Sequence, residues 1–174
     1  MSNKYNTKLF EISKDSKKLN WKDLHKQFVK GTAFENIGSE DHNIKEEKYY
    51  LYYDQKPIGY FCLGRDKETM QNIGILFMAI DKKMRGCGIG KQIIDFSKDY
   101  VKNKGEKRLY LVTMEKLKNL INYYESLGFK YKNSYYHLWL KDGTQLPFSS
   151  KRTYNLQKDN IKNYFKFNRY FCDI

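Results

Sequence analysis

The sequence is poor in cysteine and contains no long apolar run. Its three cysteines (Cys62, Cys87 and Cys172) are odd in number and far apart, so they predict no disulfide framework and favour a reducing, cytoplasmic setting. The longest uninterrupted apolar run spans residues 75–80, whereas a membrane span needs roughly 20 apolar residues. The first residues also lack the apolar segment of a secretory signal. We therefore expect a soluble protein with no membrane partner.

Acidic residues are outnumbered by basic ones, which gives the chain a net charge of +13. Such an excess attracts anions and leaves nucleic acid open as a partner. However, lysine greatly outnumbers arginine, and asparagine, tyrosine, phenylalanine and isoleucine are plentiful. An AT-rich genome produces this bias without any nucleic-acid partner, and the lysines are spread along the chain. We favour this compositional explanation of the charge.

The length of 174 residues fits one domain that buries its own core. From residue 48 onward, apolar periodicity and turn residues predict the order strand, strand, strand, helix, strand, helix, strand. The predicted strands are a pair within 48–64, then 72–80, 107–114 and 131–141 (one long strand or a pair), and the predicted helices lie within 89–105 and 115–129. This order is typical of the α/β class, with a mixed sheet flanked by helices.

The segment before residue 48 predicts two further elements. Residues 8–12 predict a strand, and residues 20–34 predict an amphipathic helix with Asn20 as its N-cap and Gly31 at its end. The acidic stretch 35–47 is predicted to form a loop or a short helix.

We expect the segment after the last predicted strand to be an extension of the domain. We place a single domain at residues 1–144 and a C-terminal extension at 145–174 that packs on it. Within the extension, residues 159–171 are predicted to form an amphipathic helix. The sequence leaves the role of this extension and the oligomeric state open.

Three glycines lie between a predicted buried strand and a predicted helix, in the stretch DKKMRGCGIGKQII (residues 81–94). A P-loop is excluded, because Arg85 stands where its first glycine is required and Gln92 replaces the Ser or Thr that holds magnesium. The dinucleotide fingerprint G-x-G-x-x-G is excluded because the spacing here is G-x-G-x-G.

A helix N-terminus with nearby glycines is nevertheless suited to anions. Its first backbone N–H groups are unpaired, and glycine lets a ligand approach them closely. Arg85 and Lys91 add full positive charges. The loop is therefore predicted to bind a pyrophosphate or a similar anion, and the alternative is a tight turn without a ligand.

The residues Arg85–Gly90 (RGCGIG) resemble the [Q/R]-x-x-G-x-[G/A] signature of the GNAT superfamily of N-acetyltransferases. An apolar strand, LFMAID, precedes them, and a helix follows. The strand LYLVTM and the helix ending YYESLGF come next, and this ending is similar to the F-Y-x-x-x-G-F segment that closes the superfamily's acetyl-CoA site. The resemblance covers roughly residues 48–141.

The resemblance implies a mostly antiparallel mixed sheet, splayed at its central strands, and acetyl-CoA as co-substrate. An amine attacks the thioester directly through a tetrahedral intermediate, whose oxyanion a backbone N–H near Ile80 stabilises. The diphosphate lies on the N–H groups of residues 86–91, and the pantetheine arm pairs with the central strand. The implied cofactor-binding residues are Met78, Ala79, Ile80, Arg85, Gly86, Cys87, Gly88, Ile89, Gly90, Lys91 and Asn119, with no metal ligand among them.

Tyr124 matches the family tyrosine that protonates the leaving thiolate. A tyrosine with a pKa near 10 is a fair general acid at neutral pH. Because Tyr124 also lies on the apolar stripe of its predicted helix, a purely structural role in the core is the alternative.

The sequence also departs from the family pattern. Leu117 stands where many members carry an asparagine, and Asn119 is only nearby. Many members carry a glutamate on the central strand that acts as base through water, but residues 72–80 contain no carboxylate. Asp81 and Glu115 border the predicted site, and each fits a cap or a solvated charge equally well. The base is therefore unassigned, and the three histidines, His25, His42 and His137, receive no role.

The leading hypothesis is an acetyl-CoA-dependent N-acetyltransferase acting on a primary amine of a small molecule or a protein. One alternative is an acetyltransferase toxin that modifies aminoacyl-tRNA, because AIDKKMRGCGIG resembles a stretch of such toxins. Another is a non-catalytic GNAT-like module that binds CoA or RNA. The sequence does not identify the acceptor.

Overall fold

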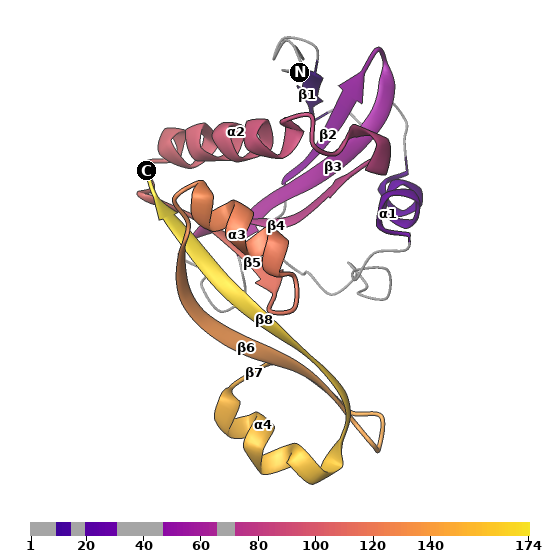
Figure 1. Cartoon of the computed structure of the whole chain (residues 1–174), viewed down its shortest axis with the longest axis vertical. Helices are drawn as coiled ribbons and strands as arrows, with labels where there is room; N and C mark the ends of the chain where they lie inside the picture. The colour runs from indigo at the N-terminus through magenta and orange to yellow at the C-terminus, as the bar shows by residue number, and fades with distance from the viewer. Residues whose placement is uncertain (1–9, 15–19, 31–46, 66–71) are drawn as a thin grey trace. The chain divides into compact units, whose positions relative to one another are not determined.

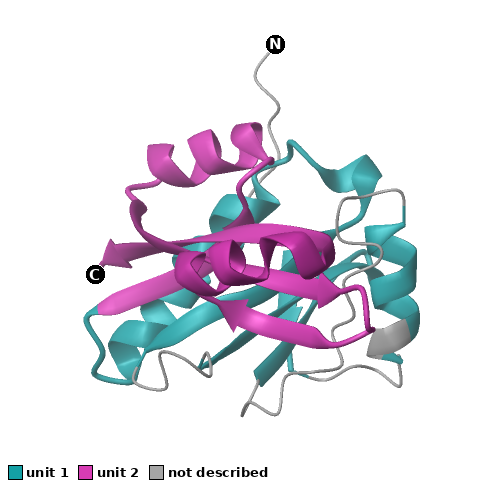
Figure 2. Cartoon of the chain, turned by 90° about the horizontal axis from the view of Figure 1, so that it is seen from below, with its two compact units in different colours: residues 1–107 teal, residues 108–174 magenta. Residues whose placement is uncertain are grey.

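The computed structural model describes residues 10–14, 20–30, 47–65 and 72–174. The chain divides into two compact units, residues 1–107 and 108–174, which Figure 2 colours separately. No helix in the described part of the chain is both long enough and apolar enough to cross a membrane.

The first unit contains four antiparallel strands in the order β1-β2-β3-β4 (Figure 1). Its elements in chain order are β1 (Phe10–Ser13), α1 (Trp21–Val29), β2 (Glu47–Tyr53), β3 (Lys56–Arg65), β4 (Ile73–Ile80), the 3-10 turn η2 (Lys82–Met84) and α2 (Ile89–Asn103). The strand pair predicted within 48–64 and the strand predicted at 72–80 are confirmed as β2, β3 and β4. Asp54 and Gln55, with φ of 48° and 59°, make the tight turn between β2 and β3, as a type I′ hairpin turn requires.

The first unit's sheet buries aromatic side chains on both faces. On one face, Tyr50, Tyr52 and Tyr60 pack with Cys62 and Ala79 against Leu24, Phe28 and Val29 of α1. On the other face, the Phe61 and Phe96 rings lie with centroids 5.7 Å apart, which joins β3 to α2. This alternation follows from the period of two along a strand and places α1 and α2 on opposite faces.

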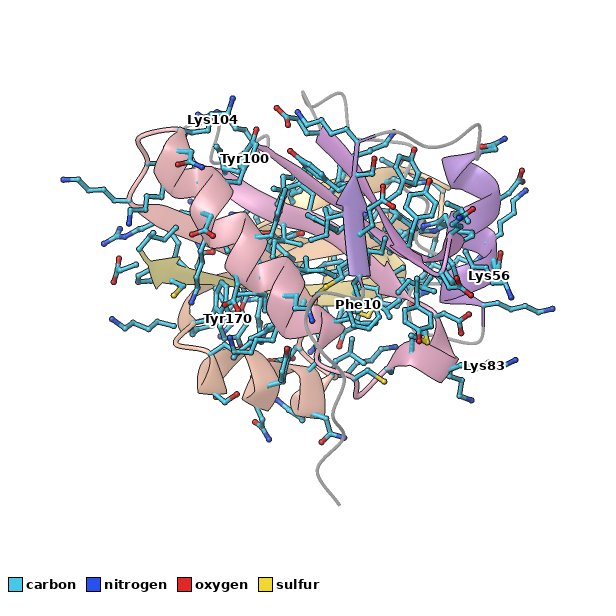
Figure 3. The ribbon with its side chains drawn as sticks, turned by 90° about the horizontal axis from the view of Figure 1, so that it is seen from above. Phe10, Lys56, Lys83, Tyr100, Lys104 and Tyr170 are labelled. Atoms are coloured by element: carbon cyan, nitrogen blue, oxygen red, sulfur yellow. The ribbon has the colours of Figure 1, made fainter. Side chains whose placement is uncertain are left out.

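Both helices of the first unit begin close to the predicted residues, and α2 also ends close to its predicted end. The Asn20 carbonyl accepts the N–H groups of Asp23 and Leu24, at 3.1 and 3.2 Å, so the predicted start of α1 is confirmed. The predictions for Gly31 and for residues 35–46 lie outside the described residues. At the C-terminal end of α2, the Lys104 ammonium lies 5.4 Å from the centroid of the Tyr100 ring (Figure 3). Gly105 follows with φ of 75°.

The second unit contains four antiparallel strands, in the order β5-β8-β6-β7. Its elements are β5 (Arg108–Met114), α3 (Lys118–Ser126), β6 (Lys130–Leu140), β7 (Gln145–Ser149), α4 (Lys151–Gln157), the 3-10 turn η3 (Lys158–Asn160) and β8 (Ile161–Asp173). The predicted order of elements from residue 48 to 141 is therefore confirmed, as is the predicted class of a mostly antiparallel sheet with flanking helices. The predicted splay of the central strands stays a prediction.

The helix predicted at residues 159–171 is wrong, because residues 161–171 belong to β8 and residues 159 and 160 to η3. The helix of this segment is α4, which begins after Ser150, whose hydroxyl accepts the Thr153 N–H at 3.1 Å. β8 pairs with β5 on one side and with β6 on the other. Residues 145–174 thus supply a central strand of the second unit, while the predicted domain boundary at 144 stays a prediction.

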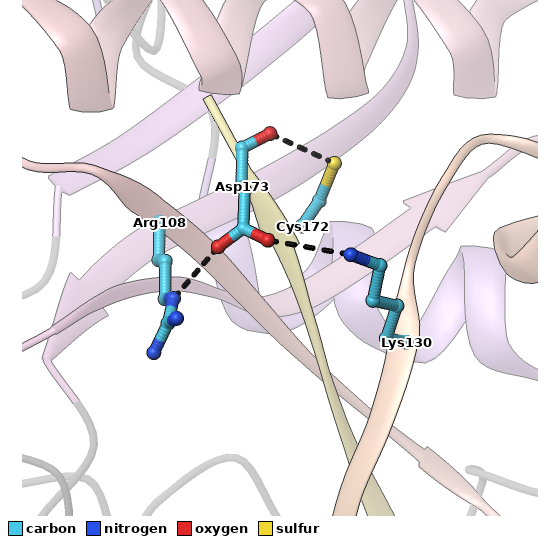
Figure 4. A network of polar contacts seen from close by, with 4 residues as sticks. All are labelled: Arg108, Lys130, Cys172 and Asp173. Carbon is cyan, nitrogen blue, oxygen red and sulfur yellow. Dashed lines mark hydrogen bonds and ion pairs between the residues drawn. The ribbon is translucent and has the colours of Figure 1, made fainter.

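The end of β8 is held to both neighbouring strands by one carboxylate (Figure 4). Arg108 of β5 donates to Asp173 Oδ1 at 2.8 Å, and Lys130 of β6 donates to Asp173 Oδ2 at 3.5 Å. The hydrogen bond from Arg108 is the main cause that lowers the pKa of Asp173.

Candidate active site

The candidate site begins where β4 ends. The Asp81 N–H donates to the Ile58 carbonyl at 2.8 Å, and the Asp81 carboxylate accepts the Lys83 N–H at 2.9 Å. Asp81 is therefore the N-cap of η2 and turns the chain out of the sheet.

Two glycines in this loop adopt a left-handed conformation. Gly86 and Gly88 have φ of 79° and 82°, and Gly88 occupies the N-cap position of α2. No atom lies within 4 Å of where a Cβ would stand on either residue, so backbone conformation rather than space requires glycine here. The outer side of the loop is open at both positions.

The loop presents a row of backbone N–H groups at the start of α2. The Gln92 N–H donates to the Gly88 carbonyl at 3.2 Å. Among the residues that the structure describes, none accepts a hydrogen bond from the N–H groups of residues 86–90. Helix N-termini carry partial positive charge, so this donor set suits the diphosphate of acetyl-CoA.

The two cations predicted for this site have partners within the first unit. Arg85 donates to the Ile80 carbonyl at 3.1 Å and to the Phe28 carbonyl at 3.4 Å, which ties the loop to β4 and α1. Lys91 pairs with Asp95 one turn along α2, at 2.6 Å. The backbone N–H groups are therefore the donors that point to an anion most directly. The Cys87 thiol lies 3.9 Å from the Arg85 carbonyl.

The last residues of β4 lie against β3. Ala79 is buried, and Met78 and Ile80 are half-buried. A Cβ added to Gly59 would stand 2.5 Å from the Ala79 carbonyl oxygen, so glycine at position 59 allows β3 to approach this part of β4. The pairing predicted between pantetheine and residues 78–80 stays a prediction.

Tyr124 lies on α3, in the second unit, with 6% of its surface exposed. The Phe129 ring is edge-on to it, with the centroids 5.9 Å apart. Its hydroxyl forms no hydrogen bond with any residue that the structure describes. Burial raises the pKa of Tyr124 well above its ordinary value, so the phenol stays protonated and retains a proton to donate. Asn119 is exposed in the first turn of the same helix.

Neither acidic residue that borders the predicted site is an uncommitted base. Asp81 caps η2, and Glu115 pairs with Lys166 at 2.5 Å within the second unit. No group of three or more His, Cys, Asp or Glu side chains gathers as a metal site in the described part of the chain.

Sequence reasoning missed one polar pair in the first unit. His25 Nδ1 is hydrogen-bonded to the hydroxyl of Tyr60, and both side chains are buried. The two residues are 35 positions apart, so no local pattern signals their contact. His137, by contrast, stacks on Trp139 with centroids 4.3 Å apart, and His42 lies outside the described residues.

Comparison with known proteins gives a consistent assignment. A model of the acetyltransferase (GNAT) family matches residues 7–129. An acetyltransferase from Elizabethkingia anophelis, solved with acetyl-CoA bound, is similar with a TM-score of 0.61 at 16% identity, covering 95% of this chain and 99% of that chain. A Bacillus subtilis acetyltransferase in complex with CoA gives a TM-score of 0.62 at 15% identity, covering 95% and 97%.

A third similar structure is the ribosomal-protein-S18-alanine N-acetyltransferase from Escherichia coli. Its TM-score is 0.58 at 16% identity, covering 95% of this chain and 94% of that chain. At these identities the structural likeness establishes the shared fold.

Proposed function

Because the chain belongs to the acetyltransferase (GNAT) family and uses acetyl-CoA as its acetyl donor, we propose that it acetylates a primary amine of a small molecule or a protein. The observation that carries this proposal is the row of N–H groups at residues 86–90, which meets the requirement of a diphosphate at a helix N-terminus. Bound acetyl-CoA supplies the thioester carbonyl that the amine attacks.

The loop and β4 position the donor in this proposal. The left-handed glycines, Gly86 and Gly88, hold the N–H groups outward toward the diphosphate. The backbone of Met78, Ala79 and Ile80 pairs with the pantetheine arm, and a backbone N–H near Ile80 stabilises the oxyanion. These groups are fixed by the fold before the substrate arrives, which is the condition for efficient electrostatic stabilisation.

Tyr124 is proposed as the acid that protonates the leaving thiolate. Burial keeps the phenol protonated at neutral pH and makes it a weaker acid than an ordinary tyrosine, so the role is supported by the match to the family tyrosine and not by its pKa. The apolar contact with Phe129 keeps the ring in one orientation.

A second candidate function is binding of CoA without acetyl transfer. One observation favours it: β4, with the sequence IGILFMAI, contains no carboxylate that would serve as a base on the central strand.

A screen of primary amines distinguishes the two functions. The purified chain is incubated with acetyl-CoA and a panel of polyamines, amino acids, aminoglycosides and peptides with free N-termini, while release of the CoA thiol and the mass of each amine are followed. We expect at least one amine to gain an acetyl group. If CoA raises the melting temperature and no amine is acetylated, the binding function replaces the transferase.

A further inference from the structure

Three tyrosine rings of the second unit pack together where α4 lies on β6 (Figure 1). Tyr136 of β6 is buried and stacks on Tyr154 of α4, with the ring centroids 4.7 Å apart. Tyr164 of β8 is edge-on to Tyr154, with the centroids 5.0 Å apart, and its centroid lies 6.2 Å from that of Tyr136. Tyr164 nevertheless keeps 45% of its surface exposed. The two inner rings therefore hold the outer ring in place while nearly half of it remains in solvent.

Three lysines lie on the same side of these elements as the exposed rings. Lys151 and Lys158 stand three residues before and four residues after Tyr154, so they share its side of α4. Lys158 keeps a helical backbone, with φ of −48° and ψ of −42°. Lys162 stands two residues before Tyr164 and shares its face of β8. All three lysines are exposed, and none forms an ion pair with a residue that the structure describes. Their charges are therefore available to an anion.

Acidic side chains are scarce around this surface. We call it the tyrosine–lysine surface, and it consists of Tyr154, Tyr164, Lys151, Lys158 and Lys162. Residues 150–166 contain five cations and one carboxylate, that of Asp159. Glu115 reaches this region from the end of β5, but it pairs with Lys166 at 2.5 Å, and the Lys166 ammonium lies 6.0 Å from the centroid of the Tyr136 ring. The fold therefore gathers cations beside exposed rings and leaves few carboxylates there.

We propose that the tyrosine–lysine surface binds single-stranded nucleic acid, with an unpaired base on the Tyr164 ring and the neighbouring phosphates on the lysines. This binding is a function additional to acetyl transfer. Every base has a flat π-face, so stacking on an exposed aromatic ring requires no particular sequence. Lysine neutralises the backbone phosphates, which makes the affinity depend on salt. Exposed aromatic rings beside a row of cations are the combination by which proteins bind single strands.

Two other occupants fit the tyrosine–lysine surface less well. A second copy of this chain would bring its own lysines against these lysines, and like charges in contact oppose association. An acidic protein segment would pair with the lysines, but its carboxylates have no aromatic face to stack on Tyr164. An unpaired base joined to a phosphate satisfies both the ring and the cations.

Fluorescence anisotropy with the full chain measures this binding in the absence of acetyl-CoA. The probes are labelled oligo(U) and oligo(dT) of about 12 nucleotides, and binding of either one supports the proposal. Tyr164→Leu removes the flat ring, so the Kd should rise about tenfold, whereas Tyr164→Phe keeps the ring and should bind like the wild type.

Tyr131→Leu is the matched control for the ring. Tyr131 of β6 is also an exposed tyrosine of the second unit, at 54%. Its partner in the register is Tyr170, which lies along β8 from Tyr164 by roughly 20 Å. The Kd of this variant should equal that of the wild type.

The salt dependence of binding tests the lysines. Each phosphate contact on a single strand adds about 0.7 to the slope of log K against log salt concentration. Lys158→Gln and Lys162→Gln should therefore each reduce this slope by about 0.7. Lys132→Gln is the control, because Lys132 is exposed on β6 and lies over the Tyr110 ring, outside the tyrosine–lysine surface. It should keep the wild-type slope.

Three results would overturn the proposal. The first is a wild-type chain that binds neither oligonucleotide. The second is an unchanged Kd in Tyr164→Leu. The third is displacement of labelled oligo(U) by polyphosphate or polyglutamate as readily as by unlabelled oligo(U) of equal total charge, because charge alone would then account for binding. If Tyr164→Leu does not fold, this competition on the wild-type chain decides. Since no step uses acetyl-CoA, the result is independent of the amine screen.

Discussion

Glu47 connects three elements of the first unit through one carboxylate. It accepts hydrogen bonds from the hydroxyls of Tyr49, at 2.7 Å, and Tyr100, at 2.8 Å, and pairs with Lys14 at 2.6 Å. These partners, with Lys14 the largest contributor, lower the pKa of Glu47 to about 2 from its ordinary 4.5. Burial, followed by the hydrogen bond to Glu47, raises the pKa of Tyr100 to about 12. The carboxylate thus joins β2, α2 and the end of β1.

We predict that this network makes the first unit sensitive to acid. A carboxyl whose pKa is lower in the folded state stabilises the fold above its unfolded pKa, and the contribution is lost as pH falls through the folded pKa. For Glu47 this window runs from about pH 4.5 down to about 2. In Glu47→Gln, the free energy of unfolding measured with urea should therefore change less with pH across this window than in the wild type. Tyr100→Phe removes one of the three partners and should reduce this pH dependence by a smaller amount. If the free energy of unfolding depends on pH in both variants as it does in the wild type, the account is contradicted.

Tyr124 allows a separate prediction at the residue scale. Tyr124→Phe keeps the buried ring and removes the proton that the thiolate needs, so kcat should fall about tenfold or more while the KM for acetyl-CoA barely changes. Tyr123→Phe, on the neighbouring half-buried ring, is the matched control and should retain kcat. An unaltered kcat in Tyr124→Phe would place Tyr124 in the core alone.

Individual residues were predictable where their role is local. The glycine spacing at 86–90 predicts a turn before a helix start, and Gly86 and Gly88 are left-handed just before α2. Anion binding by this loop stays a prediction. The His25–Tyr60 hydrogen bond was not predictable, because its partners meet only when α1 packs on β3. The contact between Arg85 and the Phe28 carbonyl was also not predictable, since the two residues are 57 positions apart.

At the scale of elements, α2 carries a left-handed glycine near each end. Gly88 has φ of 82° at its N-terminus and Gly105 has φ of 75° beyond its C-terminus, and neither has an atom within 4 Å of a Cβ position. The two glycines therefore have the same conformational requirement and differ in their place relative to the proposed diphosphate.

This symmetry gives a controlled test of the loop. Alanine in the left-handed region costs about 1 kcal/mol, so Gly88→Ala and Gly105→Ala should lower the melting temperature by similar amounts. Only Gly88→Ala should raise the Kd for CoA, because relaxation of the strained backbone turns the N–H groups of the loop. Calorimetric titration with CoA measures this difference, and equal affinities in the two variants would argue against diphosphate binding at the loop.

Helices and strands were predictable where a glycine marks the end of the element and the apolar residues follow one spacing, either that of a helix or that of a strand. β8 was not predictable, because its apolar residues fit both spacings. Ile161 and Phe165 fit helical spacing, while Phe165, Phe167 and Phe171 fit the alternation of a strand. Pairing with both β5 and β6 satisfies the backbone of β8, and this decides in favour of the strand.

The position of β8 predicts that the C-terminal segment is required for folding. A chain truncated after residue 144 loses α4 and the strand between β5 and β6, so those two strands have no partner on that side. We expect the truncated chain to lose its cooperative thermal transition in circular dichroism. Removal of Ile174 alone, which lies beyond β8 and is 42% exposed, should leave the transition in place. A truncated chain that melts cooperatively at the wild-type temperature would show that the segment is a dispensable extension.

At the scale of the whole molecule, each unit carries part of the proposed chemistry. The first unit holds the loop of residues 86–90 and the last residues of β4, and the second holds Tyr124 and Asn119. The fold and the cofactor were predictable from the sequence because one strand–loop–helix motif identifies both. The acceptor was not, since no local pattern encodes it.

A crystal structure with CoA bound is the measurement that tests the central claim most directly. The account predicts that the diphosphate oxygens accept hydrogen bonds from the backbone N–H groups of residues 86–90, at the N-terminus of α2. A diphosphate bound elsewhere, with these N–H groups facing only water, would contradict it.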